Sequence, residues 1–377
     1  MRIAINTRFL ISGKLEGIGI YTQEIIKRTV RLMPEHEFYF LFDRPYSDEF
    51  IFADNVTPLI VSPPARHPFL WYWWFEHAVP KIVEKYNIDL FFSPDGFCSL
   101  NTKIAQIITV HDLGFEHFSN HVPFLVEKYY RHFSPKYCAK AQKILAVSAF
   151  TKQDIIRNYQ IDEKKIDVLY NGFEKDQWSI VNGPMENLST IDNRLSSKQA
   201  YFIFIGAVHP RKNVLNLLKA FEEFKSKYNQ SHQLLIIGRK AWLNSELEAF
   251  YAQMTFREDV IWIEKTERNE LLHLLQNAFA LVYPSWFEGF GIPLLEAMHL
   301  GVPIITSTTS VMPEIAGNAA ILVDPGKVNE IADAMNTLIS DSILRNKLIE
   351  NGFTRAKLFD WNASAKKLVN LIREFEK

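Results

Sequence analysis

The segment ALVYPSWFEGFGIPLLEAMHLGVPIITS, residues 280–307, carries the pattern that decides the fold of this chain. It begins and ends with short apolar runs, ALVY and VPIITS, which are typical of buried strands. Between them, IPLLEAMHLG has helical character, with Pro293 suited to the start of a helix and Gly301 to its end. The order strand, helix, strand predicts one unit of a parallel α/β sheet.

The same alternation of apolar runs and helix-period stretches extends over most of the 377 residues. The first set of expected strands comprises RIAINTRF, EFYFLFD, PLIVS, DLFFSPD, QIITVHD, KILAVS and IDVLYNG. The second set comprises YFIFIG, QLLIIG, VIWIE, ALVYPS, VPIITS and AAILV. Two such sets predict an α/β fold of two Rossmann-like domains that face each other across a cleft, where ligands of open sheets usually bind.

The domain boundaries follow from residues 173–199, which are polar and poor in periodicity. We interpret this stretch as a linker between an N-terminal domain, residues 1–172, and a C-terminal domain, residues 200–357. The last residues, about 358–377, are expected to include an amphipathic helix that is able to pack back on the N-terminal domain.

Composition and charge exclude several classes of protein. The formal net charge of −1 argues against a nucleic-acid partner bound by bulk electrostatics. Cys98 and Cys138 are the only cysteines and form no Cys-x-x-Cys pair, which disfavours a disulfide scaffold or a cysteine zinc site. The start MRIAINTRFL lacks the order of a signal peptide, and no run approaches the roughly 18 apolar residues of a membrane span. A soluble, cytoplasmic protein is therefore predicted.

The turn at residues 286–291 is built to hold an anion. Gly289 and Gly291 permit positive φ and a close approach of the backbone to a ligand. The free N–H groups and the dipole of the helix that follows form an anion site. Glu296 is expected in the first turn of this helix, where a carboxylate can simply complement the dipole. That explanation does not account for Glu288 together with both glycines.

A second anion site is predicted in FIGAVHPRKNVLNLLKAF, residues 204–221. The strand there ends at Gly206, and Arg211 and Lys212 precede a helix for which Asn213 is the expected cap. Because cations beside a helix start are repelled by its dipole, an anion is expected between them. The alternative is a solvated helix start.

A third loop, LEGIGIYTQEII, places Gly17 and Gly19 between the first strand and the first helix. Glycines at this position are common in α/β domains and indicate little by themselves. Three such loops on two facing domains favour a ligand with a diphosphate and polyhydroxyl parts.

These motifs occur together in one known family. The matching stretches are GIGIYT, ITVHDL, AVSAFTKQDI, VLYNGF, FIGAVHPRKN and PSWFEGFGIPLLEAMHLGVPIITS. With them, and with the E-x7-E spacing of Glu288 and Glu296 joined to Arg211 and Lys212, the sequence resembles the retaining glycosyltransferases of family 4, which have the GT-B fold. RHPFLWYWWFEHAVPKIV, residues 66–83, also resembles a branch common in bacterial surface-polysaccharide assembly, where GDP-mannose is a frequent donor.

The resemblance implies how a nucleotide-sugar donor would be bound. Glu296 would accept hydrogen bonds from the ribose hydroxyls, each contributing roughly 1.5–3 kcal/mol because the acceptor is charged. Arg211 and Lys212 would hold the diphosphate and stabilise the charge that develops as it leaves. The other implied donor contacts are the backbone groups of Gly17, Gly19, Gly206, Gly289, Phe290 and Gly291.

The implied catalytic residues are Glu288, His111, Arg211 and Lys212. Glu288 would face the hydroxyls and the reacting carbon of the donor sugar, and His111 would hydrogen-bond the transferred sugar. A purely structural explanation for His111 is a capping pair at a strand end, with Asp112 orienting the ring or capping the turn. No residue stands out as a nucleophile, so we expect the acceptor to attack from the face that the phosphate leaves.

No metal ion or other cofactor is expected. The chain contains no Asp-x-Asp pair and no clustered set of histidine or cysteine ligands. Arg211, Lys212 and the helix start after Gly291 can supply the positive charge instead.

The tryptophan-rich stretch has two interpretations. At helical spacing, one stripe is predicted to face the core, namely Trp71, Phe75, Ala78, Val79, Ile82 and Tyr86. Trp73 and Trp74 are harder to bury. The later segment EKYYRHFSPKYCAKAQK is basic and rich in tyrosine. The region is therefore either a solvated helix face or a contact with anionic lipid or a lipid-diphosphate acceptor.

The predicted function is transfer of a hexose, with mannose from GDP-mannose as the first choice, to a glycan or lipid-linked sugar. An epimerase of the same fold is one alternative, which turnover of the donor without an acceptor would reveal. A non-catalytic protein that binds a nucleotide sugar is another, although it would not need both glutamates. The expected location is the cytoplasm, with peripheral contact at the inner face of the cell membrane.

Overall fold

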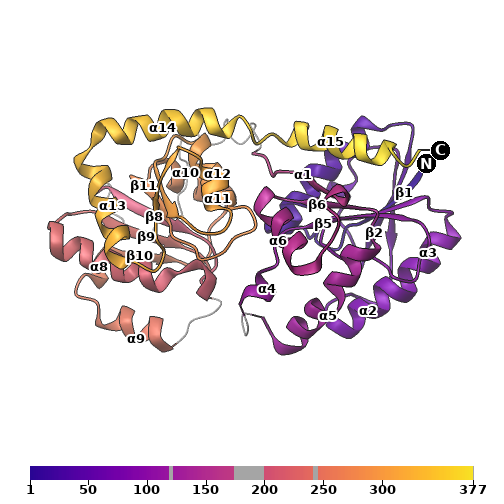
Figure 1. Cartoon of the computed structure of the whole chain (residues 1–377), viewed down its shortest axis with the longest axis horizontal. Coiled ribbons are helices and arrows are strands. Elements are labelled where there is room, and N and C mark those ends of the chain that lie inside the picture. Colours follow the sequence, from indigo (N-terminus) through magenta and orange to yellow (C-terminus); the bar gives the residue numbers. More distant parts are fainter. Residues whose placement is uncertain (119–121, 174–198, 241–244, 377) are drawn as a thin grey trace. The chain divides into compact units, whose positions relative to one another are not determined.

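The computed structural model describes residues 1–118, 122–173, 199–240 and 245–376 (Figure 1). The chain forms two compact units, one of Met1–Gly172 with Asp360–Lys377 and the other of Phe173–Phe359. Apart from its two end residues, the linker predicted at 173–199 lies outside the described residues. In the described part of the chain, no helix combines the length and the apolar character that crossing a membrane requires.

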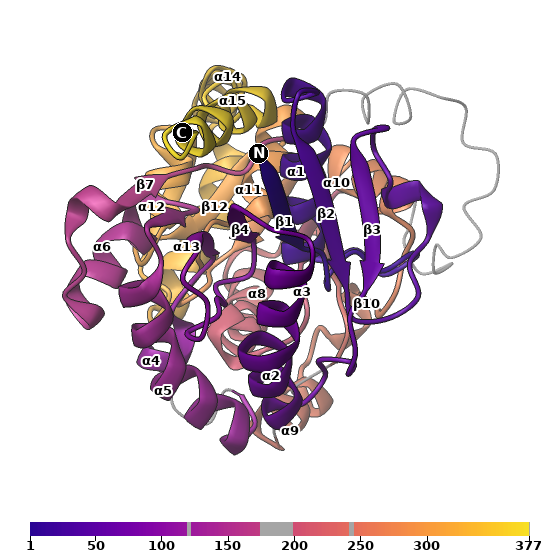
Figure 2. The same ribbon diagram turned by 90° about the vertical axis from the view of Figure 1, so that its right-hand side faces the viewer.

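The N-terminal unit contains a parallel sheet of seven strands in the order β3-β2-β1-β4-β5-β6-β7. The strands are β1 Arg2–Asn6, β2 Glu37–Phe42, β3 Val56–Ile60, β4 Leu90–Ser93, β5 Ala105–Val110, β6 Lys143–Ala146 and β7 Ile166–Val168. The helices are α1 Gly17–Leu32, α2 Pro68–Trp73, a π-helical turn Trp74–Ala78, α3 Val79–Lys85, α4 Gly114–His117, α5 Phe124–Lys140, α6 Ala149–Tyr159 and α15 Trp361–Arg373. Helices α1 and α15 cover one face of the sheet, and α2, α3 and α5 cover the other (Figure 2).

The C-terminal unit contains a parallel sheet of six strands in the order β10-β9-β8-β11-β12-β13. The strands are β8 Tyr201–Ile205, β9 Gln233–Ile237, β10 Val260–Ile263, β11 Ala280–Tyr283, β12 Ile304–Ser307 and β13 Ala320–Val323. The helices are α8 Val214–Tyr228, α9 Ser245–Gln253, α10 Arg268–Gln276, α11 Ile292–His299, α12 Met312–Ala316, α13 Val328–Ser340 and α14 Ser342–Ala356. Helix α8 packs with α13, and α11 packs with α14.

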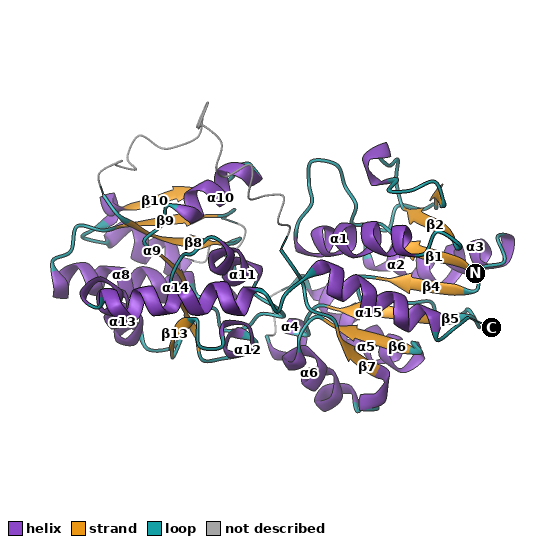
Figure 3. Ribbon diagram, turned by 90° about the horizontal axis from the view of Figure 1, so that it is seen from above, coloured by secondary structure: helices purple, strands orange, loops and turns teal. Residues whose placement is uncertain are grey.

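The strands are short apolar runs because helices lie on both faces of each sheet (Figure 3). Every residue of β4, β8, β9, β11 and β12 is buried. Each of the thirteen runs predicted as strands corresponds to one strand of the structure, so the prediction of two Rossmann-like α/β units is confirmed.

The end of the chain returns to the N-terminal unit through α15, which packs against α1. This is the amphipathic helix expected at the end of the chain, and it buries an apolar face that includes Ala365, Leu368, Val369 and Ile372. Ser364 Oγ also donates a hydrogen bond to the carbonyl oxygen of Tyr170, at 2.7 Å. At Gly172 a Cβ atom would lie only 2.4 Å from the backbone nitrogen of Trp361. Glycine is therefore required where the returning chain passes.

The tryptophan-rich stretch is mostly core. Phe75 and Val79 are fully buried, as predicted for the stripe. Trp74 is also fully buried, and its indole N–H donates to the carbonyl oxygen of Val61 at 2.9 Å, so the expectation that it is hard to bury was wrong. The π-helical turn Trp74–Ala78 shifts the helical register by one residue, which the ideal spacing could not anticipate. Trp73 remains half exposed.

Candidate active site

Arg211 and Lys212 lie in a single 3₁₀ turn, Pro210–Lys212, between β8 and α8. Gly206, which follows β8, has φ +149°, and a Cβ atom there would lie 3.9 Å from Lys212 Nζ. Asn213 has φ +61° and makes no side-chain cap, in contrast to the prediction. Its amide instead donates to the carbonyl oxygens of Pro284, at 3.0 Å, and Pro325, at 2.7 Å. Asn213 therefore fixes the basic turn against the loop that follows β11.

Glu288 is buried between the two cations. Lys212 Nζ forms an ion pair with Glu288 Oε1, and Arg211 Nη1 lies 3.6 Å from Oε2. The Tyr283 hydroxyl accepts from Lys212 Nζ and donates to Glu288 Oε1, at 3.0 Å for the second bond. The structure thus brings together three of the predicted site residues. Glu288 lies more than 70 positions after Arg211 and Lys212 in the sequence.

The electrostatics of this cluster keep the carboxylate ionised. Burial by itself would raise the pKa of Glu288, but the Lys212 and Arg211 cations hold it below the ordinary value of 4.5. Because the pKa is lowered on folding, the stability that this group contributes is present above pH 4.5 and is lost as the pH falls below it. Burial, followed by the Glu288 charge, raises the pKa of Tyr283, so its hydroxyl remains a neutral donor.

Tyr283 was not singled out from the sequence. Its ring is buried and stacks on Phe204 with ring centroids 5.5 Å apart. The only sequence signal is the polar tip of a tyrosine at the last position of an otherwise aliphatic strand, ALVY. At that position the side chain reaches the carboxyl edge of the sheet, where Lys212 and Glu288 lie.

The loop that carries Glu288 is held from several sides. The backbone N–H of Trp286 donates to the carbonyl oxygen of Arg211 at 2.8 Å. Arg211 Nη1 donates to the carbonyl oxygen of Phe287 at 3.4 Å, and the backbone N–H of Glu288 donates to Ser310 Oγ at 3.2 Å. These bonds link the loops after β8, β11 and β12 into one rigid support for the carboxylate.

The glycines of this turn have different roles. Gly291 precedes α11 with φ +90°, a left-handed conformation that favours glycine, and a Cβ atom there would lie 2.7 Å from the flexible end of the Met312 side chain, at Cε. Gly289 is not among the residues with positive φ, so of the two glycines only Gly291 uses the conformational freedom that both permit. Phe290 is buried, and its ring meets the Phe359 ring edge-on with centroids 5.7 Å apart.

Glu296 lies in the second turn of α11, not in the first as predicted, because the helix begins at Ile292. Its carboxylate is buried and pairs with Arg268, with Nη2 2.5 Å from Oε1. Arg268 begins α10 and is 38% exposed, whereas the Glu296 side chain is 3% exposed. The favourable effect of the helix dipole on a carboxylate is confined to the first turn. Because Glu296 lies in the second turn, this effect does not explain its presence. Arg268 is a second residue that sequence reasoning did not identify.

His111 lies in the N-terminal unit, directly after β5. Its Nε2 is 2.7 Å from the carbonyl oxygen of Pro94, which can only accept, so Nε2 carries a proton. Burial lowers the pKa of His111, which favours the neutral ring and leaves Nδ1 as an acceptor. Asp112 Oδ1 accepts from the backbone N–H of Gly114 at 2.8 Å and so caps the turn.

Gly17 and Gly19 lie in the first turn of α1, and not in the loop before it as predicted. A Cβ atom at Gly19 would lie 2.8 Å from the carbonyl oxygen of Phe9, so the loop passes close to this helix. Beside Gly17, apart from its chain neighbours and the nearby backbone of α1, no heavy atom of the described residues lies within 4 Å of the position that a Cβ would take. Within the described part of the N-terminal unit, a side chain would therefore find room at Gly17 but not at Gly19.

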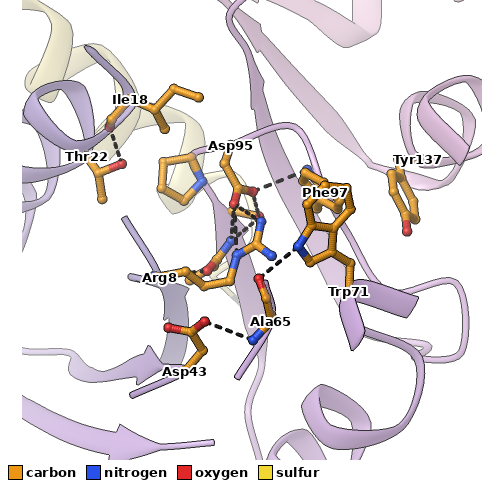
Figure 4. Close-up of polar contacts among 12 residues, drawn as sticks. Arg8, Ile18, Thr22, Asp43, Ala65, Trp71, Asp95, Phe97 and Tyr137 are labelled. Atoms are coloured by element: carbon orange, nitrogen blue, oxygen red, sulfur yellow. Dashed lines mark hydrogen bonds and ion pairs between the residues drawn. The ribbon is translucent and has the colours of Figure 1, made fainter. Parts of the chain in front are cut away.

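A buried ion pair supports the region that holds His111 (Figure 4). Arg8 follows β1 and Asp95 follows β4, and Arg8 donates to Asp95 Oδ2 through Nη2, at 2.5 Å, and Nε, at 3.2 Å. Asn6 also donates to Asp95 Oδ2, at 2.8 Å. The guanidinium lies 4.7 Å from the centre of the Phe97 ring. Since Pro94 precedes Asp95, this network positions the carbonyl group that His111 binds.

One cluster of potential metal ligands occurs among the described residues, and it lies elsewhere. Glu35, His36 and Glu376 have ligand atoms within 4.8 Å of one another. His36 already contacts the amino group of Met1 through Nδ1, at 3.0 Å, and Glu376 through Nε2, at 2.9 Å. His36 precedes β2, so this cluster is at the amino ends of the strands, opposite to the edge that carries His111.

Comparison with known families agrees with this geometry. Two family models match in succession, Glycosyltransferase Family 4 over residues 15–177 and Glycosyl transferases group 1 over residues 189–355. The chain therefore belongs to the family 4 glycosyltransferases, whose fold is GT-B.

Individual relatives extend over nearly the whole chain. The chain is 25% identical to O-antigen chain mannosyltransferase B of Escherichia coli, over 96% of each sequence. It is 27% identical to O-antigen chain mannosyltransferase RfbU of Salmonella typhimurium, over 80% of this chain and 81% of the relative.

Solved structures show the same fold. A glycosyltransferase from Rickettsia africae matches with a TM-score of 0.74 and 18% identity, over 99% of this chain and 98% of the other. Anabaena HepE in complex with UDP-glucose matches with a TM-score of 0.74 and 17% identity, over 99% of this chain and 100% of the other.

Proposed function

We propose that this protein is a retaining hexosyltransferase that uses a nucleotide-diphosphate sugar, with GDP-mannose as the first candidate donor. The observation that carries the proposal is the cluster of Arg211, Lys212 and Glu288 at the carboxyl edge of the C-terminal sheet. A site with two cations and a buried, ionised carboxylate suits a ligand with a diphosphate at one side and sugar hydroxyls at the other.

The exposed fractions indicate how a donor would enter this cluster. The Arg211 side chain is 27% exposed and that of Lys212 is 14% exposed, whereas Glu288 is only 8% exposed. Phosphate oxygens can therefore reach the cations from solvent, while the carboxylate stays fixed behind them. Glu288 is then in position to accept hydrogen bonds from the donor sugar without losing its own support from Tyr283.

The names of the relatives support the choice of substrates. Both O-antigen relatives are named as mannosyltransferases, and HepE was crystallised with UDP-glucose. We therefore take a nucleotide sugar as donor, mannose as the transferred hexose, and a glycan or lipid-linked sugar as acceptor. The proposed location is the cytoplasm, where nucleotide sugars are made.

The proposed reaction exchanges one bond to the anomeric carbon for another. The acceptor hydroxyl oxygen bonds to that carbon on the face from which the phosphate oxygen departs. The departing diphosphate takes the proton of the acceptor, and its developing charge is stabilised by Arg211 and Lys212. His111, as a neutral acceptor at Nδ1, is proposed to orient a hydroxyl of the transferred sugar.

Thermal unfolding with a panel of nucleotides and nucleotide sugars would test the donor first. A donor at about 100 times its Kd stabilises the protein by about 2.7 kcal/mol. Transfer of a labelled hexose to a lipid-linked acceptor would then test the reaction. Loss of donor without a glycosylated product would instead indicate an epimerase or a hydrolase.

The anomeric configuration of the product is expected to equal that of the donor. Attack on the anomeric carbon from the face that the leaving group vacates preserves the configuration. In the proposed route the diphosphate takes the proton, so no side chain of the described residues acts as a base on the opposite face. NMR of the new glycosidic linkage, through its one-bond carbon–proton coupling, would measure the configuration. An inverted product would contradict the proposed route and require a general base.

Replacing Tyr283 by phenylalanine is expected to lower kcat by roughly 10- to 100-fold, with little change in donor KM. The change removes one hydrogen bond to the Glu288 carboxylate, and a bond of this kind contributes about 1.5–3 kcal/mol. Initial rates at saturating donor would measure it. Tyr201→Phe is a matched control, because that buried hydroxyl donates to a backbone carbonyl, that of Leu274, at 2.7 Å, and not to a residue of the cluster. Equal losses in both variants would contradict a specific role of Tyr283.

A further inference from the structure

Large apolar side chains are exposed together on α2 and α5 of the N-terminal unit. We call them the α2–α5 face, which consists of Phe69, Leu70, Tyr72, Trp73, Phe124 and Leu125. Their exposed fractions run from 37% for Leu70 to 71% for Phe69. Among the described residues, six of the thirteen exposed large hydrophobic side chains belong to this face. Such clustering differs from the scattered apolar residues of an ordinary surface.

The two helices form one firm support for this face. Helices α2 and α5 contact each other and lie side by side in two views of the molecule (Figures 1 and 2). The Tyr72 and Phe133 rings lie 5.8 Å apart across the contact. Trp71 faces inward, where its indole N–H donates to the carbonyl oxygen of Ala65 at 2.8 Å (Figure 4). Adjacent residues of a helix point in different directions. With Trp71 fixed toward the core, the neighbouring Tyr72 and Trp73 therefore point toward solvent.

Positive charge accompanies the apolar side chains. Arg66, Lys128 and Lys136 are exposed, and Lys128 Nζ lies 4.2 Å from the centre of the Phe124 ring. One acid, Glu127, lies on α5, and another, Glu76, lies in the π-helical turn that follows α2. Glu127 Oε1 forms an ion pair with Arg131 Nε at 3.0 Å. Glu76 is buried and accepts from the backbone N–H of Leu100. The exposed charge of the face is therefore positive.

We propose that the α2–α5 face docks on the surface of an anionic phospholipid bilayer. Aromatic side chains are favoured at the boundary between headgroups and acyl chains, and neighbouring lysines are attracted to anionic headgroups. Lysine is depleted in protein–protein interfaces, so a face in which Lys128 and Lys136 flank aromatic residues fits a membrane better than a protein partner. The exposed side chains can enter only the boundary between headgroups and acyl chains. The proposed binding is therefore peripheral and does not span the bilayer.

This inference goes beyond the proposed transfer reaction and does not depend on it. Binding to lipid concerns the N-terminal unit, whereas the Arg211, Lys212 and Glu288 cluster belongs to the C-terminal unit. A direct binding measurement without donor or acceptor can therefore fail or succeed independently of the enzymatic proposal. If both hold, the docked face would keep the enzyme at the surface where a lipid-linked acceptor is found.

Cosedimentation of the full-length protein with vesicles tests the proposal. We expect binding to vesicles of phosphatidylglycerol and phosphatidylcholine in equal parts, and at least about tenfold weaker binding to phosphatidylcholine alone. The difference should shrink as salt rises above about 0.1 M, where the screening length falls below about 10 Å.

Two variants separate the apolar and charged contributions. Phe69→Ser with Trp73→Ser, and Lys128→Glu with Lys136→Glu, are each expected to weaken binding to the anionic vesicles at least about tenfold. The matched controls are Leu32→Ser with Ile343→Ser, and Lys103→Glu with Lys164→Glu, at exposed positions outside α2 and α5. The controls should bind as the unchanged protein does. Circular dichroism and the shift in Tm with nucleotide would verify that every variant folds.

Three results would overturn the proposal. One is absence of binding to anionic vesicles at low salt. Another is equal binding by the face variants and their controls. The third is a dimer of the unchanged protein, detected by ultracentrifugation without lipid, that Phe69→Ser with Trp73→Ser converts to a monomer. That result would make the face an interface between two copies of this chain.

Discussion

Replacing both Arg211 and Lys212 by alanine is expected to lower kcat by at least about three orders of magnitude. Removal of a single donor that stabilises a developing anion typically costs about 10²–10³ in rate, and here both cations would be lost. The same change leaves Glu288 buried without its two cationic partners, so its pKa should rise. Initial rates at saturating donor and acceptor would measure the effect.

The matched control for this double variant is Lys219→Ala. Lys219 lies on α8 of the same unit and pairs with the exposed Glu246, at 3.3 Å, so its loss changes charge without touching the cluster. Its kcat should stay within about twofold, as expected for an exposed ion pair. A double variant of Arg211 and Lys212 that retains full turnover would contradict the assignment of the leaving-group charge to these two side chains.

The same assignment makes a divalent metal ion unnecessary, and activity is expected to survive excess EDTA. The fixed cations carry the charge that a metal ion would otherwise supply to the leaving diphosphate. The measurement is the rate of transfer in EDTA, compared with the rate after addition of magnesium or manganese. Complete loss in EDTA with recovery on adding either ion would show that the cations are not sufficient.

The sequence predicted the elements well because their cause is local. A strand buried on both faces must be apolar throughout, so runs such as YFIFIG and QLLIIG could be identified without knowledge of their neighbours. The grouping of Arg211, Lys212 and Glu288 was also accessible, since residues after parallel strands meet at one edge of a sheet. What the pattern could not provide is the partner of each side chain.

Tyr283 and Arg268 illustrate that limit. Tyr283 ends an apolar strand, and the pattern therefore predicts a core residue. In the structure its hydroxyl group joins Lys212 to Glu288. Arg268 begins a helix far from Glu296 in the sequence, and only the packing of α10 on α11 brings them together. Asn213 failed as a helix cap for a similar reason, because two carbonyl groups of other loops take up its amide.

The two glutamates of the E-x7-E pair are expected to differ in kinetic role. Glu296→Gln should raise the donor KM by about 10- to 100-fold and leave kcat nearly unchanged. Loss of a charged hydrogen bond costs about 1.5–3 kcal/mol, and contacts to the ribose are shared by the ground and transition states. Glu288→Gln should instead lower kcat by about 100-fold or more, because this carboxylate is held by the cations proposed to act on the leaving group.

Arg268 provides a sharp test of this division, because it contacts Glu296 and belongs to a different helix from Lys212. Arg268→Gln should change donor KM in the manner of Glu296→Gln and leave kcat close to that of the unchanged enzyme. Steady-state kinetics with varied donor at saturating acceptor would resolve KM and kcat for all three variants. The division fails if Glu288→Gln and Glu296→Gln show equal effects confined to KM, since both carboxylates would then only bind the donor.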